Sequence, residues 1–259
     1  HGAIIDEAQN APFLFSYLQE IVDKNKVMGQ FILTGSQQFG LLSGISQSLA
    51  GRVGLVELLP LSVSELGGQV GSVNEQLYRG FYPTIYDRDL DPRIWYEDYI
   101  KTYIERDVRK LINIKDLNSF RSFLKLCAAR NGQLLNISEL CTASGINRKT
   151  AESWLSILEA SYIVYFLSPH FKNFSKRIVK SSKLYFYDTG VVSSLLGFNS
   201  SDELALSTFK GAMFESLITT EIKKYNMNYR KGVDFYFWRD NKGTEIDLLF
   251  EKGTKLFSV

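Results

Sequence analysis

Apolar and polar positions in the first part of the chain follow the spacing of two strands and a helix. The apolar run in HGAIIDEAQ, residues 1–9, ends on the adjacent acids Asp6 and Glu7, and a second run, Phe31–Leu33, ends at a Thr-Gly-Ser sequence. Between the runs, one helical face gathers the apolar side chains Leu14, Tyr17, Leu18, Ile21 and Val22. Strand, helix and strand at this length predict a βαβ unit, and therefore a parallel sheet covered by helices.

Polar residues follow both predicted strands at the carboxyl edge of the sheet, where ligands bind in α/β proteins. Asp6 suits Mg²⁺, held directly or through water, and Glu7 suits a base that orients water onto a γ-phosphate. Thr34 or Ser36 would hydrogen-bond that water or the phosphate. Adjacent acids after a strand also occur in plain surface turns, and the pair by itself favours that interpretation.

The pattern becomes helical after a glycine-rich break between Gly67 and Gly71. From Trp95 onward, aromatic and aliphatic side chains recur at helical spacing, and the charged residues among them fit a solvated, ion-paired face. We expect residues 67–115 to form a helical connector.

A helix-turn-helix pattern follows. Apolar residues alternate with polar ones, and Gly145 interrupts them where two helices would turn. Asn147 is suited to cap the second helix, which places Arg148, Lys149 and Thr150 at its exposed start. In helix-turn-helix proteins the start of this recognition helix meets DNA. The strand-like sequence YIVYFL after it predicts a winged form over residues 116–170.

Basic and aromatic residues then alternate in quick succession. The basic ones are Lys172, Lys176, Arg177, Lys180 and Lys183, interleaved with Phe171, Phe174 and Tyr185. Such a mixture suits phosphate contact plus base stacking, so Lys176 and Arg177 join the candidate DNA contacts. A basic run also serves as a solvated face, and winged helices also bind proteins. DNA and a protein therefore both stand as partners.

The last quarter combines an acid on a predicted helix with an acid on a predicted strand. Glu215 lies at the margin of an apolar helical stripe, and Asp247 lies in the second of three alternating segments separated by glycine-containing turns. The two acids are candidates for a shared metal site. Ion pairs with Lys223 or Arg239 are the alternative.

Composition limits the protein class. The 259 residues are 45% hydrophobic and 22% charged, which is typical of globular proteins, and the net charge of +2 decides little. No apolar run approaches the roughly 18 residues that span a bilayer, and no signal peptide is visible. Cys127 and Cys141 lack metal-site spacing and predict buried thiols in a reducing compartment. We expect a cytoplasmic protein without membrane contact; the sequence does not set its oligomeric state.

Three segments resemble, in order, the Walker B, sensor and post-sensor segments of AAA+ ATPases. They are IIDEAQ (4–9), FILTGSQQ (31–38) and SLAGRVGLVELLPLSVSEL (48–66). More narrowly, they and YIKTYIERDVRKL (99–111) are similar to a group of prokaryotic predicted ATPases with a C-terminal domain of unknown function. The resemblance implies that the intact protein uses ATP and Mg²⁺. It also implies that Arg52, which matches an arginine of that family, senses nucleotide.

That family's phosphate-binding loop, G-x-x-x-x-G-K-[ST], precedes the Walker B strand, and no such run occurs in this sequence. The loop and its lysine supply most of the phosphate grip. We therefore expect the chain to be a fragment of an ATPase that holds no cofactor tightly and lacks ATPase activity by itself.

The helix–strand pair of acids resembles the restriction-endonuclease-like fold of Holliday-junction resolvases, including a glycine, Gly211, four residues before Glu215. The resemblance implies that Glu215 and Asp247 hold Mg²⁺, which activates water against a phosphodiester. A Glu-x-Lys sequence completes that site on the next strand, and here it would fall about where the chain stops, at Val259. Many members of this fold are inactive and only bind.

These expectations define an α/β protein in four parts. They are the C-terminal part of an AAA+ parallel-sheet core (1–66), a helical connector (67–115), a winged helix-turn-helix (116–170) and a truncated restriction-endonuclease-like domain (171–259). The leading hypothesis is nucleotide-driven DNA binding or remodelling. The alternatives are a metal-dependent nuclease regulated by the ATPase, and a non-enzymatic nucleotide sensor whose winged helix binds a protein.

Overall fold

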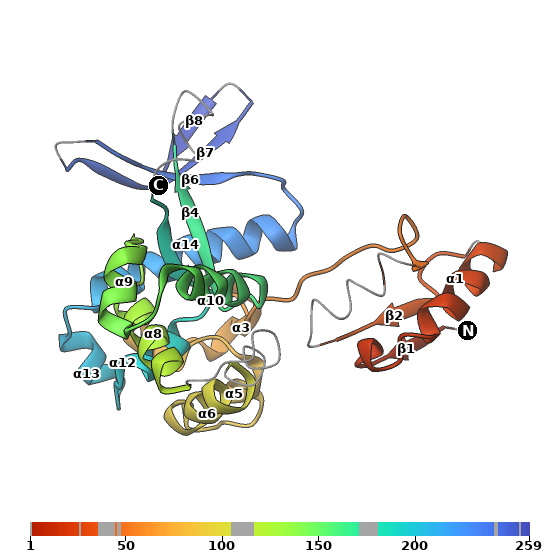
Figure 1. The fold of residues 1–259 in the computed structure, drawn as a ribbon, viewed down its shortest axis with the longest axis horizontal. Helices are drawn as coiled ribbons and strands as arrows, with labels where there is room; N and C mark the ends of the chain where they lie inside the picture. The colour runs from red at the N-terminus through yellow and green to blue at the C-terminus, as the bar shows by residue number, and fades with distance from the viewer. Residues whose placement is uncertain are drawn as a thin grey trace. The chain divides into compact units, whose positions relative to one another are not determined.

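The protein is a mixed α/β structure made of two compact units, residues 1–58 and 59–259 (Figure 1). The computed structural model describes residues 2–25, 27–35, 45, 48–104, 117–170, 181–240, 243–253 and 255–259. Within these ranges, no helix combines the length and the apolar character that a membrane crossing requires.

The first unit contains the predicted βαβ arrangement. Strand β1 (Ala3–Ile5) is followed by the short 3-10 helix η1 (Ala8–Asn10), helix α1 (Leu14–Asn25) and strand β2 (Phe31–Leu33). The two strands pair in parallel, with Ile4 opposite Ile32. Phe15 and Leu18 of α1 are buried with Ala8, Ile45 and Leu49. The prediction of a parallel strand pair covered by a helix is confirmed.

The second unit begins with short helices whose ends are set by capping residues and proline. Ser62 and Glu65 form a capping box at the start of the helix Val63–Leu66, and Ser72 and Glu75 form another at the start of the helix Val73–Arg79. Proline is the first residue of the helices Pro83–Asp87 and Pro92–Tyr99. The elements are α3 (Val63–Leu66), η2 (Gly67–Gln69), α4 (Val73–Arg79), α5 (Pro83–Asp87), α6 (Pro92–Tyr99) and the π-helix η3 (Ile100–Ile104).

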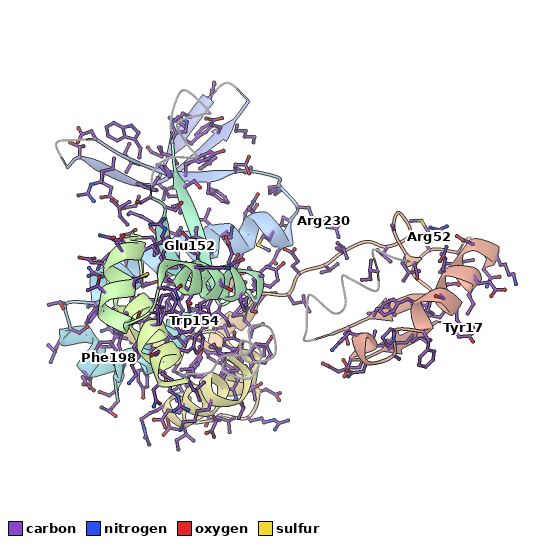
Figure 2. The ribbon with its side chains drawn as sticks, in the orientation of Figure 1. Tyr17, Arg52, Glu152, Trp154, Phe198 and Arg230 are labelled. Carbon is purple, nitrogen blue, oxygen red and sulfur yellow. The ribbon has the colours of Figure 1, made fainter. Side chains whose placement is uncertain are left out.

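Two helices joined by a tight turn lie at the centre of this unit. Gly145 ends the first in the left-handed conformation (φ 69°), and the side chain of Asn147 accepts the backbone N–H of Thr150 to cap the second. Trp154 of the second helix, labelled in Figure 2, packs edge-on against Phe120 and Phe123. The elements are α8 (Leu117–Ala129), β3 (Gln133–Leu134), α9 (Ile137–Ser144), α10 (Arg148–Ala160), β4 (Val164–Pro169) and β5 (Lys183–Phe186).

A six-stranded sheet in the order β3-β5-β4-β6-β7-β8 runs through the unit. Only β4 and β6 pair in parallel. The sheet continues across residue 170, where the sequence predicts a domain boundary; the four-part division stays a prediction. The remaining elements are α12 (Thr189–Leu196), α13 (Ser201–Leu206), α14 (Lys210–Asn228), β6 (Phe235–Arg239), β7 (Glu245–Lys252) and β8 (Lys255–Ser258).

One buried aspartate ties the short helices to the rest of the second unit. Asp188, at the start of α12, accepts the backbone N–H groups of Phe81 at 2.6 Å and Val191 at 3.0 Å. Tyr96 lies in the same core, and its ring leaves no room for a side chain at Gly190. The described buried side chains of this core extend from Leu66 to Leu217, and a second cluster contains Tyr165, Leu167, Tyr185, Tyr187, Phe237 and Leu248.

Candidate functional site

Four charged side chains from three elements meet in the second unit, and we call them the lysine–carboxylate cluster. The Nζ atom of Lys183 lies 2.9 Å from Oε1 of Glu215, 2.5 Å from Oε1 of Glu245 and 2.8 Å from Oδ1 of Asp247. Lys183 begins β5, Glu215 lies in the second turn of α14, and the other two acids belong to β7. The cluster therefore joins the sheet to the helix.

Strand periodicity explains why these side chains converge. Glu245 and Asp247 are two residues apart on β7 and so point to the same face of the sheet. Lys183 and Tyr185 are related in the same way on β5, and the Tyr185 hydroxyl donates a 2.5 Å hydrogen bond to Oε1 of Glu215. One face of the sheet thus presents its polar groups to Glu215 on α14.

Burial and charge fix the protonation of the two donors. The side chain of Lys183 is 4% exposed, against 25% for Glu215, 24% for Glu245 and 52% for Asp247. Burial alone would lower the pKa of Lys183, but the hydrogen bonds that its ammonium donates to Asp247, Glu245 and Glu215 outweigh burial and raise the pKa. Burial, reinforced by the Glu215 charge, raises the pKa of Tyr185. Both donors therefore keep their protons at neutral pH.

The structure brings Glu215 and Asp247 together, and it adds Lys183 and Glu245, which the sequence does not predict as members of this site. Glu245 can be assigned to this site only once it is known that β7 includes it. Its spacing of two residues from Asp247 could nevertheless have indicated that both side chains point to the same face of a strand. Lys183 appears in the sequence as the end of a basic run facing a partner. It is instead buried among acids, so the structure corrects that interpretation: Lys183 presents no charge to a surface partner.

The fit of these residues to a metal ion is limited by the ammonium group between them. In the described ranges, no group of three or more His, Cys, Asp or Glu side chains is arranged to hold a metal ion. The three carboxylates of the cluster converge on Nζ of Lys183, a cation that the chain itself provides. A metal role for Glu215 and Asp247 stays a prediction.

A second polar site lies at the carboxyl edge of the β1–β2 pair. The Thr34 hydroxyl donates a hydrogen bond to Oδ1 of Asp6, which also accepts the backbone N–H of Glu7 at 3.0 Å. Glu7 has a left-handed backbone (φ 50°), and its carboxylate accepts a 2.6 Å hydrogen bond from Gln9. The structure thus brings Asp6, Glu7 and Thr34 together, as the strand ends predict. Ser36 lies outside the described residues.

Arg52 has a partner that the sequence does not reveal. Its Nε and Nη2 atoms lie 2.6 Å and 3.0 Å from the two carboxylate oxygens of Asp23 on α1, and Nη1 donates to the carbonyl of Ala50. The hydrogen bond from Arg52 lowers the pKa of Asp23. In this structure the guanidinium anchors its segment to α1, and a nucleotide-sensing role stays a prediction.

The start of α10 presents the predicted DNA contacts. Arg148 and Lys149 are exposed and Thr150 is half-buried in the first turn after the Asn147 cap. Nε of Arg148 lies 2.7 Å from Oε1 of Glu152, an exposed pair one turn apart. Lys176 and Arg177 lie outside the described residues.

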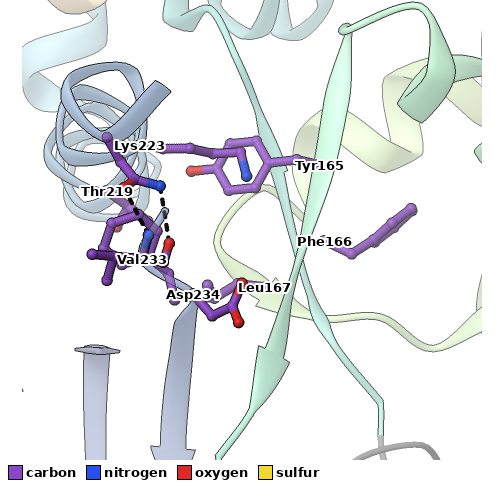
Figure 3. A pocket seen from close by; sticks show the side chains of 9 residues that line it. Tyr165, Phe166, Leu167, Thr219, Lys223, Val233 and Asp234 are labelled. Atoms are coloured by element: carbon purple, nitrogen blue, oxygen red, sulfur yellow. Dashed lines mark hydrogen bonds between the residues drawn. The ribbon is translucent and has the colours of Figure 1, made fainter. Parts of the chain in front are cut away.

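A pocket of about 240 Å³ lies between β4 and α14 (Figure 3). The Lys223 ammonium lies 5.0 Å from the centre of the Tyr165 ring, and Asn226, another lining residue, makes two hydrogen bonds to the backbone of Val233. None of the predicted site residues lines it.

The parallel β1–β2 pair and the six-stranded sheet, together with the helices, define a mixed α/β protein. The chain belongs to the family described as Domain of unknown function (DUF8612), which matches residues 70–202. Residues 1–67 match a family described as AAA domain, and residues 210–259 match Domain of unknown function (DUF4143). The AAA match supports an ATPase-type family, and the predicted pairing of an AAA part with a C-terminal domain of unknown function is confirmed.

Similar proteins occur in mycobacteria. The chain is 33% identical over 251 residues to Uncharacterized protein Rv2008c of Mycobacterium tuberculosis and to Uncharacterized protein Mb2031c of Mycobacterium bovis. Each alignment covers 95% of this chain and 55% of the relative, so the chain spans about half the length of the curated relatives it matches. No solved structure matches the chain.

Proposed function

We propose that this chain is part of an ATPase that binds DNA through a winged helix. The winged helix would be formed by α8, β3, α9, α10, β4 and β5. The observation that carries this proposal is the exposed start of α10, where Arg148 and Lys149 follow the Asn147 cap. Backbone N–H groups and the helix dipole make this end of a helix attractive to phosphate, and the two basic side chains add to that field.

The packing behind α10 supports the same proposal. Ala151, Trp154, Leu155 and Leu158 are buried in the main core, so the opposite face of the helix, with Arg148 and Lys149, points away from it. After the helix, β4 and β5 pair antiparallel, as the wing of a winged helix requires. We propose Lys176 and Arg177, which lie between these strands in the sequence, as further phosphate contacts.

We infer that ATP and Mg²⁺ act at the edge of the β1–β2 pair in the intact protein. The support is the match to an AAA domain together with the contact between Asp6 and the Thr34 hydroxyl. Asp6 would hold the ion directly or through water, while Glu7 orients the attacking water and Thr34 fixes the Asp6 carboxylate. The bound ion would neutralise charge on the phosphates.

A second candidate function, a metal-dependent nuclease, is favoured by the convergence of Glu215 and Asp247. Cleavage would require a metal ion where these acids now bind Lys183. DNA binding without cleavage needs no such rearrangement, and it remains our main proposal. A protein partner for the winged helix is the outcome that the experiment below would reveal.

The test is DNA binding by the full-length protein, measured by fluorescence anisotropy with a labelled duplex at several salt concentrations. Substituting Arg148, Lys149, Lys176 and Arg177 with alanine should weaken binding and flatten the plot of log K against log[salt] by about 0.9 per lost phosphate contact. The matched control is Arg93→Ala with Lys101→Ala, two exposed basic residues of α6 and η3. Unchanged affinity and slope in the quadruple variant would reject DNA contact here and favour a protein partner.

A further inference from the structure

We propose that Lys183 is a built-in cation of the lysine–carboxylate cluster: it holds Glu215, Glu245 and Asp247 together in place of a metal ion and closes the cluster to divalent cations. This role is independent of DNA binding. It bears on the second candidate function, because a metal ion would have to displace the ammonium group before it could bind these three acids.

The hydrogen bonds of Lys183 leave the ammonium group with no free donor. A lysine ammonium has three N–H donors. Each is matched by one carboxylate oxygen, at 2.9 Å for Glu215, 2.5 Å for Glu245 and 2.8 Å for Asp247. The Glu215 and Asp247 distances are those of charge-assisted hydrogen bonds, and the ion pair with Glu245 is shorter still. Lys183 therefore satisfies the acids and is not poised to grip a substrate phosphate.

The charges explain why a cation is needed at this position. Three carboxylates approach a single point, and at that point the lysine side chain is 4% exposed. Without a cation there, the acids would repel one another or bind protons. Arg239 adds one more positive charge, 3.5 Å from Glu245, so among the residues that the structure describes two cations face three anions. The residual negative charge is what would draw in a divalent ion once the ammonium is removed.

A divalent ion and the ammonium cannot both occupy the cluster. Mg²⁺ binds carboxylate oxygens at about 2.1 Å, so an ion among these three oxygens would lie almost on top of Nζ. The Phe237 ring lies beneath the ammonium with its centre 5.7 Å from Nζ, a cation–π contact that adds to the attraction of the three carboxylates. This arrangement differs from the metal site that the restriction-endonuclease resemblance implies. In this chain the same two acids, Glu215 and Asp247, are joined by lysine.

The test is a titration of residues 1–259 with Mn²⁺. Binding is monitored by isothermal calorimetry and by the electron paramagnetic resonance signal of free Mn²⁺. The wild-type chain should show no saturable site, and Lys183→Met should gain one site per chain. Affinity should rise by at least about tenfold, since one charge within about 4–6 Å shifts an ionisation equilibrium by one to three powers of ten. Adding Asp247→Asn to Lys183→Met should abolish the gain.

Two control variants test whether the gain in Mn²⁺ binding comes from removing the charge at position 183 or from removing any buried lysine. Lys224→Met removes another buried ammonium, which in the described part of the chain forms an ion pair with a single acid, Glu221, and it should gain no site. Lys183→Arg keeps the positive charge, so the cluster in this variant should also bind no Mn²⁺. Circular dichroism confirms that each variant folds.

The wild-type chain alone can overturn the proposal, even if Lys183→Met does not fold. Saturable 1:1 binding of Mn²⁺ to the wild type that disappears in Asp247→Asn would show that the cluster accepts a metal with Lys183 present. A folded Lys183→Met that gains no site would also refute it. Neither result changes the DNA titration, so failure of this role and failure of the proposed DNA binding are distinguishable.

Discussion

Glu215 on α14 and Asp247 on β7 share one hydrogen-bond donor, because Nζ of Lys183 lies 2.9 Å from Oε1 of the first and 2.8 Å from Oδ1 of the second. Lys183, the first residue of β5, thus binds two acids that lie 32 and 64 positions further along the chain. The contact links the helix to the sheet through polar side chains. Lys183 therefore stabilises the packing of α14 on the sheet as well as supplying a positive charge.

Replacing Lys183 by methionine should destabilise the second unit by about 3–5 kcal/mol, the cost of leaving one side of a buried ion pair without its partner. The measurement is urea-induced unfolding at pH 7, followed by circular dichroism. Lys101→Met is the control: its ion pair with Glu97 is exposed, and pairs of that kind contribute at most about 1 kcal/mol. Equal unfolding midpoints for the two variants would contradict a stabilising role for the cluster.

The contribution of Lys183 to stability should also depend on pH. Its folded-state pKa is raised above the unfolded value, which is about 10.4. The stabilisation is therefore fully present below that pH and is lost as pH rises toward the folded pKa. We expect the difference in unfolding free energy between wild type and Lys183→Met to stay constant from pH 7 to 9 and to shrink above about pH 10.4. A difference that grows over that alkaline range would oppose this assignment.

Lys224 anchors the start of the second unit to α14. Its ammonium donates 2.8 Å and 2.9 Å hydrogen bonds to the carbonyl of Leu61 and to Glu221, while Glu221 accepts the backbone N–H of Val63. The residue is 1% exposed. Lys224→Met should therefore cost about 3–5 kcal/mol in urea unfolding. Limited proteolysis should also show faster cleavage near residues 59–63, and unchanged cleavage there would mean that the anchor is dispensable.

The elements that depend on local chemistry could be predicted from the sequence. The βαβ unit follows from apolar spacing, and the turn between α9 and α10 follows from a glycine that adopts positive φ and an asparagine that caps the next helix. The convergence of Asp6 and Thr34 also follows, because parallel strands end at one edge of the sheet.

Contacts between distant segments could not be predicted in the same way. The Arg52–Asp23 pair joins residues 29 positions apart, and nothing in the local pattern selects that partner. Lys183 follows four other basic residues in the sequence, so local context suggests a surface role; only the tertiary fold brings its ammonium to Glu245 and Asp247, on a strand that does not pair with β5. The partners of a charged side chain are set by tertiary packing.

Residues 1–259 alone should bind ATP poorly, because the sequence contains no G-x-x-x-x-G-K-[ST] run to surround the phosphates. The measurement is titration with a fluorescent ATP analogue in the presence of Mg²⁺. No saturable binding in the micromolar range is expected. Micromolar affinity that disappears in Asp6→Ala would mean that the edge of the β1–β2 pair binds nucleotide without that loop.

In the full-length protein, Glu7→Gln should leave ATP binding intact and slow hydrolysis by about 10²- to 10⁴-fold, the range for removing a general base or a water-orienting group. Glutamine keeps the size of the side chain and an acceptor oxygen for Gln9, whose amide lies 2.6 Å from the Glu7 carboxylate, so the local fold should persist. Asp6→Ala should act differently, because it removes the proposed Mg²⁺ contact and should weaken binding of the Mg²⁺–nucleotide complex itself.

The matched control for this last prediction is Glu20→Gln, the same chemical change on the exposed face of α1, where Glu20 pairs only with Lys24 in the described contacts. Steady-state phosphate release gives the rate, and equilibrium titration with labelled ATP gives the affinity. Glu20→Gln should change neither. If Glu7→Gln hydrolyses ATP at the wild-type rate, the acid is not the water-orienting group. If it loses binding together with rate, its role is structural, because the left-handed turn at Glu7 then supports the nucleotide site rather than the chemical step.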